Sequence, residues 1–522
     1  MGRSPFHDPC SYRRLVVPKR ASGGRAGRIA ARAATEQNIN PVPPGQIGGQ
    51  YKPLSEEEVR RIIDEAYRVL EEIGMAEVPP RLEDRALQNG AFLKQGRLCF
   101  PRAMLEDLIA ITPKTYTFYG RNPKHKITVG QGTYYCTGGA AVQTLDIDTR
   151  LYRPSTLKDL YDFTRLADLM DQISVFTRIC VATDLPDNRE LDLNTAYALI
   201  AGTEKPVGTS FFLSEYVQPA VDMFDMALGG RGKFREQPFC NVHISPVISP
   251  LKYGEDAFDV ALAAIETGMP INAIIAAQSG ATAPATIAGM VVAGTAETLA
   301  ALAMVQLFGP GHPMIFSNWP FVIDLRSGAF CGSGGEIALM NAASAQASNA
   351  LGLPSGVAAS MADAKGVDAQ MVAEKALTSA LTGLAGANMI YESAGMMASL
   401  LGVSFEAMIL DNEMLAHATR TIRGVEVNAH TLGFEAIYEA VFGEGHFLGG
   451  AHTMAAMERD YFYPQLADRT APTLWQEQGA PEAWQTANLK VRELLEHHHP
   501  TYIDPHIDAR IRAKYPIRLS TS

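Results

Sequence analysis

The hydrophobic positions between residues 270 and 319 form two short apolar runs with one long apolar segment between them. The runs at 271–276 and 314–316 have strand length, whereas 287–308 is rich in Ala, Leu and Met and contains no proline. That composition favours helix, and a strand, a crossover helix and a second strand form a βαβ unit. Because both runs are apolar throughout most of their length, we expect a parallel sheet that is buried on both faces.

The boundaries of this unit recur along the chain. Gly268-Met269-Pro270, Gly311-His312-Pro313 and Gly352-Leu353-Pro354 each separate a helix-like segment from a strand-like one, and they lie 43 and 41 residues apart. Glycine suits the left-handed turn at a helix end, and proline fits the first position of a strand. The near-constant spacing predicts an α/β fold, a closed TIM (β/α)8 barrel, because such a barrel uses about eight of these units.

The same pattern predicts the individual elements of the barrel. Strands are expected at residues 175–181, 206–212, 239–245, 271–276, 314–317, 355–359 and 388–391, with a weaker eighth near 401–405. Helices are expected between them at 191–201, 216–228, 254–266, 287–308, 336–351 and 369–384.

The segments outside the predicted barrel have other patterns. Ser55 and Glu58 form a capping box, and apolar residues then recur at helical spacing up to Gly74. Between 115 and 152, Tyr, Thr and Val alternate with glycine, which predicts antiparallel hairpins. We therefore expect a basic arm (1–45), an N-terminal helix and antiparallel cap (46–170), the barrel (171–405) and a C-terminal helical extension with a polar tail (406–522).

Composition narrows the functional classes. The 522 residues are 47% apolar and can bury a large core, but no window of about 18 residues is apolar without interruption, so we expect no membrane span. The net charge of -11 disfavours nucleic acid as a partner. Six scattered cysteines without a CxxC pair argue against a disulfide framework or a structural zinc site, and they indicate a reducing cytoplasm.

The first 40 residues differ from the rest in charge, with eight Arg or Lys and two acidic residues. An Arg-rich, acid-poor start is compatible with an organellar transit peptide. We favour an arm that is disordered or wraps a neighbouring subunit of a homo-oligomer, because no cleavage-like boundary follows.

Candidate site residues follow from the barrel, because a barrel carries its site at the carboxyl ends of its strands. The residues there are Phe211, Phe212, His243, Gln278, Asn318, Trp319, Tyr391 and Glu392. They include no Ser/His/Asp arrangement, phosphate-binding glycine loop or metal-ligand cluster. Such a rim suits a cationic ligand on aromatic faces, at about 0.5–2 kcal/mol per contact, with Glu392 as counter-charge. Core packing of the aromatic residues and a hydrogen-bonded core role for His243 remain open alternatives.

Two further segments leave other chemistry open. Lys365 follows a predicted strand, and a buried lysine there would suit a Schiff-base lyase or aldolase, although a solvated lysine is the more common case. His446 and His452 lie in a Gly-rich segment, and we interpret them as turn and lid residues.

Several stretches resemble the trimethylamine methyltransferase family, in particular its non-pyrrolysine, glycine betaine methyltransferase-like branch. The matching stretches are GGQYKPLSEEE (48–58), TYYCTGGAAVQTLD (133–146), RPSTLKDLYDFTRLAD (153–168), SGAFCGSGGEIALMNAASAQ (327–346), GLPSG (352–356), GANMIYESAG (386–395) and GEGHFLGGAHTM (443–454). The resemblance extends from about residue 45 to 470 and so covers nearly the whole chain.

The resemblance implies a barrel that transfers an N-methyl group from a quaternary or tertiary methylated amine to the Co(I) corrinoid of a small separate protein, as in methanogenesis. The cofactor supplies the nucleophile, so the barrel needs only to orient the methyl group and exclude water. No pyrrolysine is present, and its equivalent position is expected in or near 360–370. We predict catalytic roles for Gln278, His243 and Glu392; a barrel that binds methylated ammonium compounds without turnover is the alternative.

Two departures from the family bear on the substrate. The betaine-using members carry an Arg and a His where this chain has Gly356 and Glu392, and both would hold a substrate carboxylate. Since one carboxylate repels another, we predict a substrate without a nearby carboxylate, or one with extra positive charge or a hydroxyl. A family tyrosine that faces the substrate matches Tyr134 or Tyr135. The predicted substrate-binding residues are Tyr134, Tyr135, Phe211, Phe212, Asn318, Trp319, Tyr391, Gly356 and His446.

Overall fold

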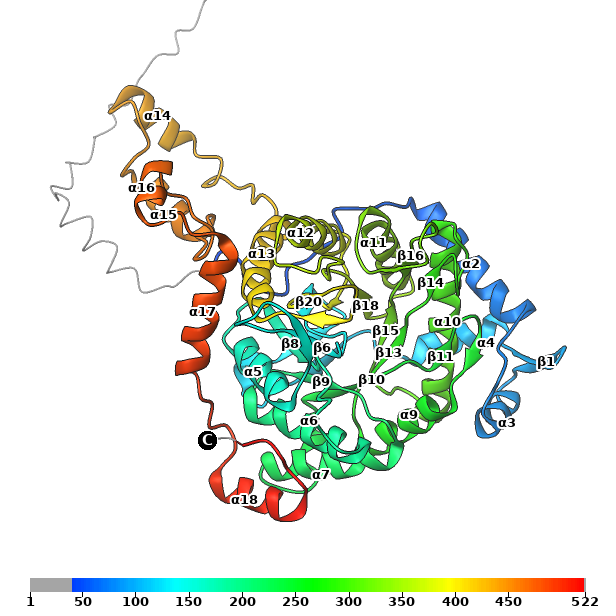
Figure 1. Cartoon of the computed structure of the whole chain (residues 1–522). Coiled ribbons are helices and arrows are strands. Elements are labelled where there is room, and N and C mark those ends of the chain that lie inside the picture. Colours follow the sequence, from blue (N-terminus) through cyan, green and yellow to red (C-terminus); the bar gives the residue numbers. More distant parts are fainter. Residues whose placement is uncertain (1–39, 521–522) are drawn as a thin grey trace, which may run out of the picture. The chain divides into compact units, whose positions relative to one another are not determined.

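Eight short parallel strands close into a barrel, which confirms the predicted fold class. The computed structural model describes residues 40–520. In order around the ring the strands are β5 (Tyr134–Cys136), β8 (Ile173–Thr177), β9 (Val207–Thr209), β10 (Cys240–Ile244), β13 (Ile271–Ile275), β15 (Met314–Asn318), β18 (Ser355–Ala358) and β19 (Met389–Tyr391). Parallel pairing of β19 with β5 closes the ring. Figure 1 shows the barrel, with β8, β9, β10, β13, β15 and β18 labelled.

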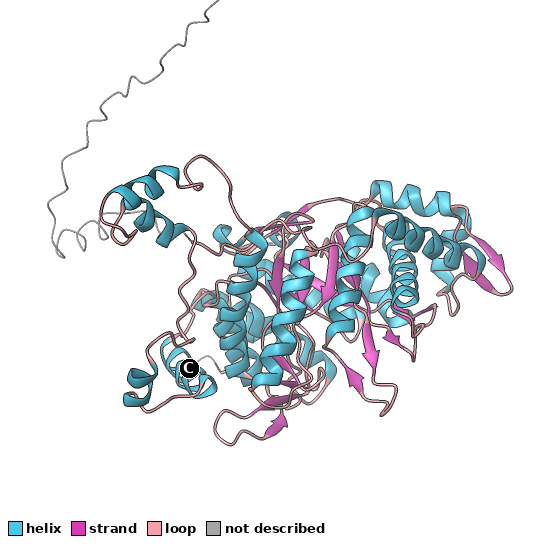
Figure 2. Cartoon of the chain, turned by 90° about the horizontal axis from the view of Figure 1, so that it is seen from above, coloured by secondary structure: helices cyan, strands magenta, loops and turns pink. Residues whose placement is uncertain are grey.

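A helix follows each strand of the barrel and packs outside the ring, so that helices enclose the strands (Figure 2). These helices are α5 (Leu157–Asp168), α6 (Asn188–Gly202), α7 (Val217–Ala227), α9 (Glu255–Thr267), α10 (Ile287–Phe308), α11 (Gly335–Ala350), α12 (Ala369–Leu384) and α13 (Phe405–Arg423). Within residues 40–520, α10 alone has the length and composition of a membrane span, and 72% of that window is buried inside the fold.

The prediction of an eighth strand near 401–405 is wrong. Residues Gly402–Val403 form β21, which joins β20 (Met396–Met397), β6 (Gln143–Leu145) and β7 (Tyr152–Pro154) in a separate four-stranded sheet. The missing barrel strand is β5, which lies within the segment predicted as an antiparallel cap. Hairpins do flank it, namely β3 (Tyr116–Phe118) with β4 (Ile127–Val129), and β6 with β7. A three-residue strand between two hairpins carries no periodic signal of its own, so the pattern could not distinguish it.

The N-terminal helix is confirmed as α2 (Glu56–Glu72). Ser55 caps it in a reciprocal capping box with Glu58, and Gly74 follows its end at a φ of 70°. Its apolar face packs on α10, which helps to bury that helix on its outer side. The same region adds α3 (Pro80–Gln88), the hairpin of β1 (Phe92–Lys94) and β2 (Arg97–Cys99), α4 (Arg102–Ile111) and the 3₁₀ turn η1 (Pro123–His125).

The remaining elements are insertions after strands and C-terminal helices. The insertions are the 3₁₀ turn η2 (Ser214–Tyr216), α8 (Lys233–Glu236), β11 (Val247–Ile248), β12 (Lys252–Tyr253), β14 (Gln278–Ser279), β16 (Phe321–Ile323) and β17 (Phe330–Cys331). The C-terminal helices are α16 (Pro472–Glu477), α17 (Ala483–His497) and α18 (Pro505–Lys514).

The chain forms two compact units, and the barrel lies within one of them, residues 42–432 and 462–520. The other unit includes 433–461, with α14 (Phe434–Phe442) and α15 (Ala451–Arg459). Most of the predicted basic arm lies outside the described residues, so its interpretation stays a prediction.

Candidate active site

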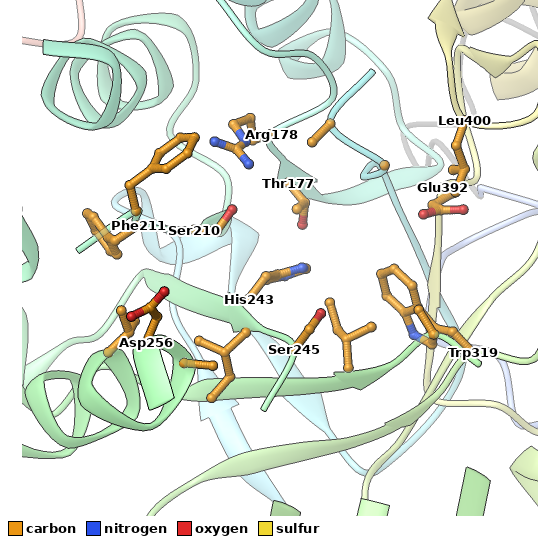
Figure 3. A pocket seen from close by; sticks show the side chains of 18 of the residues that line it. Thr177, Arg178, Ser210, Phe211, His243, Ser245, Asp256, Trp319, Glu392 and Leu400 are labelled. Atoms are coloured by element: carbon orange, nitrogen blue, oxygen red, sulfur yellow. The ribbon is translucent and has the colours of Figure 1, made fainter. Parts of the chain in front are cut away.

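A cavity of about 510 Å³ opens at the carboxyl ends of the barrel strands. Its volume lies in the range of small-molecule sites. The lining comes from nearly the whole ring and includes Gly139, Ala140, Thr177, Arg178, Ser210, Phe211, Phe212, His243, Ile244, Ser245, Ile274, Ala276, Trp319, Phe321, Glu392 and Leu400, with Asp256 at an exposed position (Figure 3).

Aromatic rings form a wall on one side of the cavity. The Tyr391 ring lies 5.0 Å from the His243 ring in an edge-on arrangement and 5.4 Å from the Trp319 ring, measured between centroids. Tyr391 is fully buried behind this wall, whereas Trp319 lines the cavity with 5% of its surface exposed. Phe211, at 8% exposure, lines another side of the same cavity. These aromatic faces are held by packing before any ligand arrives.

Glu392 is a buried carboxyl group in the cavity wall. It directly follows β19 and has a φ of 64°, a left-handed conformation that is uncommon for a residue with a side chain. Its Oε2 atom has no hydrogen-bond partner among the described residues. Burial raises the pKa of Glu392 to about 8, and the charge of Lys375 opposes that rise. Near neutral pH the group is therefore mostly protonated.

His243 is a neutral imidazole within the same wall. Burial lowers its pKa to about 3, and the nearby positive charge of Arg178 acts in the same direction. The Asn272 Nδ2 atom lies 3.4 Å from both ring nitrogens. A neutral ring can accept or donate a hydrogen bond, but it adds no charge that would repel a cationic ligand.

Arg178 is the cavity residue that sequence reasoning missed. It follows the last residue of β8, and its backbone N–H donates to the Gly208 carbonyl at 2.9 Å. The Nε and Nη1 atoms of its guanidinium are buried and have no hydrogen-bond partner among the described residues. A signal was present, since Arg178 is the one charged residue in the apolar stretch 173–182. The predicted strand of 175–181 placed it in mid-strand, away from the rim.

The structure brings five of the predicted site residues together. Phe211, Phe212, His243, Trp319 and Glu392 all line the cavity, and Tyr391 supports them from behind.

Two residues predicted at the rim are directed elsewhere. Gln278 is not among the lining residues; its backbone N–H donates to the Thr282 hydroxyl at 2.9 Å within a tight turn after β13. Asn318 is buried outside the ring, where its Nδ2 atom donates to the Ser344 hydroxyl of α11 at 3.1 Å. β13 ends one residue earlier than predicted and β15 one residue later. A shift of one residue turns a side chain to the opposite face of a strand.

The residues carried over from the family resemblance also lie away from the cavity lining. The Tyr135 hydroxyl donates to the Ser379 carbonyl of α12 at 3.1 Å, outside the ring. Tyr134 packs against Gly45. A Cβ atom at Gly356 would lie 1.9 Å from the Ser317 hydroxyl oxygen, so Gly356 allows close packing inside the barrel.

The Schiff-base alternative required a buried lysine, and the structure does not provide one at Lys365. Lys365 is exposed, and its Nζ atom donates to the Asp363 carbonyl at 2.6 Å.

His446 is an exposed residue of the unit that contains 433–461, and its Nε2 atom lies 3.7 Å from a Glu444 carboxylate oxygen. Its interpretation as a lid residue stays a prediction. Within residues 40–520, no group of three or more His, Cys, Asp or Glu side chains is arranged to hold a metal ion.

A closed parallel barrel with a cavity at the carboxyl ends of its strands defines a TIM-barrel protein with a small-molecule site. Residues 20–518 match the family model described as trimethylamine methyltransferase. The chain therefore belongs to the trimethylamine methyltransferase family, and both the resemblance and the predicted methyltransferase class are confirmed.

Characterised relatives match over most of their length. The chain is 29% identical to the glycine betaine methyltransferase of Desulfitobacterium hafniense strain Y51 over 472 residues, which cover 90% of this chain and 97% of the relative. It is 30% identical to a trimethylamine methyltransferase of D. hafniense strain DSM 10664 / DCB-2 over 465 residues, covering 88% and 92%. The crystal structure of the Methanosarcina barkeri monomethylamine methyltransferase aligns with a TM-score of 0.49 and 13% identity, covering 87% of this chain and 90% of that one.

Proposed function

We propose that this protein removes an N-methyl group from a quaternary or tertiary amine and delivers it to the Co(I) corrinoid of a separate small protein. Family membership supports methyl transfer from a methylated amine, since the relatives include glycine betaine and trimethylamine methyltransferases. The observation that carries the proposal for this chain is the cavity, whose aromatic wall and uncharged His243 suit a methylated ammonium group.

The cavity fits the amine rather than a corrin ring. A volume of about 510 Å³ is that of a small-molecule site, so a corrinoid would meet the open mouth on its own carrier protein. The corrinoid supplies the nucleophile that accepts the methyl group. The C–N bond breaks, its electron pair remains on nitrogen, and the product is an amine with one methyl group fewer. A quaternary amine needs no proton for this step.

The residues of the chain orient the substrate and exclude water. Trp319 holds the ammonium against its aromatic face, and Phe211 narrows the opposite part of the cavity. Glu392 adds a hydrogen-bond donor when protonated and a counter-charge when ionised. Trp319 and Phe211 are almost fully buried by their neighbours, so the site is pre-organised. An enzyme that acts by positioning its substrate gains its rate acceleration from such pre-organisation. Homo-oligomerisation and a cytoplasmic location stay predictions.

A Trp319→Ala variant tests the proposal. Purified protein is mixed with a reduced corrinoid carrier protein and with choline, glycine betaine, carnitine or trimethylamine, and loss of the Co(I) absorbance is followed together with the demethylated product. We expect turnover of at least one amine and a fall of about tenfold in kcat/KM for Trp319→Ala, the size of a lost cation–π contact. Trp475→Ala is the control, because Trp475 lies in the C-terminal extension, where its Nε1 atom donates to the Pro481 carbonyl at 3.2 Å. Calorimetric binding of an amine without any methyl transfer would favour the silent-binder alternative instead.

A further inference from the structure

Arg178 is a half-buried residue whose guanidinium, with Nε and Nη1 buried, has no direct counter-ion within residues 40–520. Neither Nε nor Nη1 has a hydrogen-bond partner among the described residues, although Arg178 lines the cavity. Asp192 lies near enough for its charge to affect the pKa of Arg178, but no hydrogen bond joins the two among the described residues, and the buried Oδ1 atom of Asp192 has no hydrogen-bond partner there either. Asp192 instead accepts a hydrogen bond from the Phe212 backbone N–H at 2.8 Å. Leaving a buried charge unpaired is costly, so a missing anionic partner is the simplest explanation.

Polar groups beside Arg178 extend this feature into a small polar corner of the cavity. The Thr177 hydroxyl is buried and has no hydrogen-bond partner among the described residues, and Thr177 and Ser210 both line the cavity. A guanidinium and two hydroxyl groups are all hydrogen-bond donors, and together they match the oxygens of a carboxylate. The positive charge of the guanidinium would repel an isolated ammonium ion at this corner.

The order of strands places this corner opposite the aromatic wall. Arg178 follows β8 and Trp319 follows β15, and four steps around the eight-stranded ring separate the two strands in either direction. Figure 3 shows Arg178 and Trp319 on opposite sides of the cavity, with His243 between them. Glu392 follows β19, two strands from β8, which corresponds to roughly 10 Å at the usual strand spacing.

We propose that Arg178 binds the anionic group of the substrate, and that the substrate is a zwitterion with a carboxylate separated by several bonds from its methylated ammonium. This inference rests on the proposed function, because it takes the ammonium to lie at Trp319. It agrees with the prediction that the substrate has no carboxylate beside Glu392, since the carboxylate at Arg178 would lie two strands away from Glu392. A zwitterion whose two charges are one carbon apart is too short to place its ammonium at Trp319 and its carboxylate at Arg178.

Binding calorimetry on the full chain, without corrinoid protein, tests this proposal separately from methyl transfer. The probes are trimethylammonium carboxylates with one to five carbons between the two charged groups, each compared with its uncharged amide. We expect the wild-type protein to prefer a carboxylate with three or more intervening carbons over its amide by at least tenfold. Glycine betaine, with one intervening carbon, should show no such preference.

Two substitutions assign the preference to Arg178. Arg178→Gln should remove the preference for the carboxylate and leave amide binding within about twofold, whereas Arg178→Lys should retain part of it, since lysine keeps the charge without the fork geometry. Thermal unfolding of each variant, with and without the amide, confirms that the cavity is intact.

Three results would overturn the proposal: equal binding of carboxylate and amide by the wild-type protein, an undiminished preference in Arg178→Gln, or no binding of any zwitterion in the series. Asp192→Asn distinguishes the competing explanation. If the preference appears only in that variant, Arg178 is already satisfied by Asp192 and is not a substrate-binding residue. Selective binding without methyl transfer would contradict the proposed function and leave the role of Arg178 intact.

Discussion

At the scale of single residues, Glu392 combines a position in the cavity wall with a cost to stability. Burial raises its pKa from 4.5 to about 8, so the folded protein holds a proton that the unfolded chain releases above about pH 4.5. The stability that Glu392 contributes is therefore present below pH 4.5 and is lost as the pH rises through about 8. The charge of Lys375 opposes the shift, and His243 and Arg178 are the other titratable or charged groups of the barrel interior that line the same cavity.

A Glu392→Gln variant should lose this pH dependence. We expect the variant to gain stability relative to the wild-type protein between pH 5 and pH 9, by a few kcal/mol at most, on the order of 1.4 kcal/mol for each unit of pKa shift. Urea denaturation at a series of pH values measures the difference. A gap between the two proteins that stays constant across this range would show that the Glu392 carboxyl is not desolvated. Glu266→Gln, the same substitution at an exposed position of α9, serves as control.

At the scale of elements, a buried ion pair joins the helices that follow the last two barrel strands. The Nζ atom of Lys375 in α12 lies 2.9 Å from an Asp411 carboxylate oxygen in α13, and both side chains are almost fully buried. Lys375 also donates to the Ser360 carbonyl after β18 at 2.8 Å, and Asp411 accepts from the Gly395 N–H after β19 at 2.7 Å. The pair therefore fixes two loops at the carboxyl ends of the strands.

Removing one member of this pair should be far more damaging than removing both. Lys375→Met leaves Asp411 buried and uncompensated, and we expect it to lower the free energy of unfolding by about 3–5 kcal/mol. Lys375→Met with Asp411→Leu should recover part of that loss. Lys365→Met, the same substitution at an exposed lysine, should stay within about 0.5 kcal/mol of the wild-type value. Chemical denaturation of the three proteins checks this order, and a double variant less stable than Lys375→Met would contradict it.

Elements with long apolar periods and clear boundaries could be predicted, and short strands could not. The bounds of α10 and α12 agree with the sequence pattern because Gly, Pro and Asp residues mark their ends. β5 was assigned to a cap because three residues show no period. The same imprecision at strand ends explains the site: Trp319 and His243 were found, whereas Arg178 was placed inside a strand that ends one residue before it. Interior packing, such as that of Gly356 on Ser317, depends on residues of neighbouring strands, so it cannot be predicted from the sequence of one strand alone.

At the scale of the whole molecule, the segment after residue 462 returns to the barrel and is tied to it through α5. The Arg165 Nη1 atom donates to the carbonyls of Leu495 at 2.6 Å and His498 at 2.7 Å. Beside it, the Asp168 carboxylate accepts from the Tyr502 hydroxyl at 2.6 Å and lies 3.1 Å from His498 Nε2. These contacts join residues more than 300 positions apart in the sequence, so they stabilise the tertiary fold and not a local element.

Asp168→Asn should therefore loosen the C-terminal extension in a pH-dependent way. Burial acts to raise the pKa of Asp168, but hydrogen bonds from His498, Tyr502 and Thr203 outweigh it and lower the pKa to about 2. Because the folded pKa is below its usual value of 3.8, the contribution to stability is present above that pH and is lost as the pH falls through about 2. After allowance for solvent screening, we expect the variant to be less stable by about 1–2 kcal/mol at pH 7, with the difference vanishing near pH 2. Urea denaturation at both pH values measures it, with exposed Asp171→Asn as control. A loss that persists unchanged at pH 2 would mean that the shape of the side chain, rather than its charge, holds the extension in place.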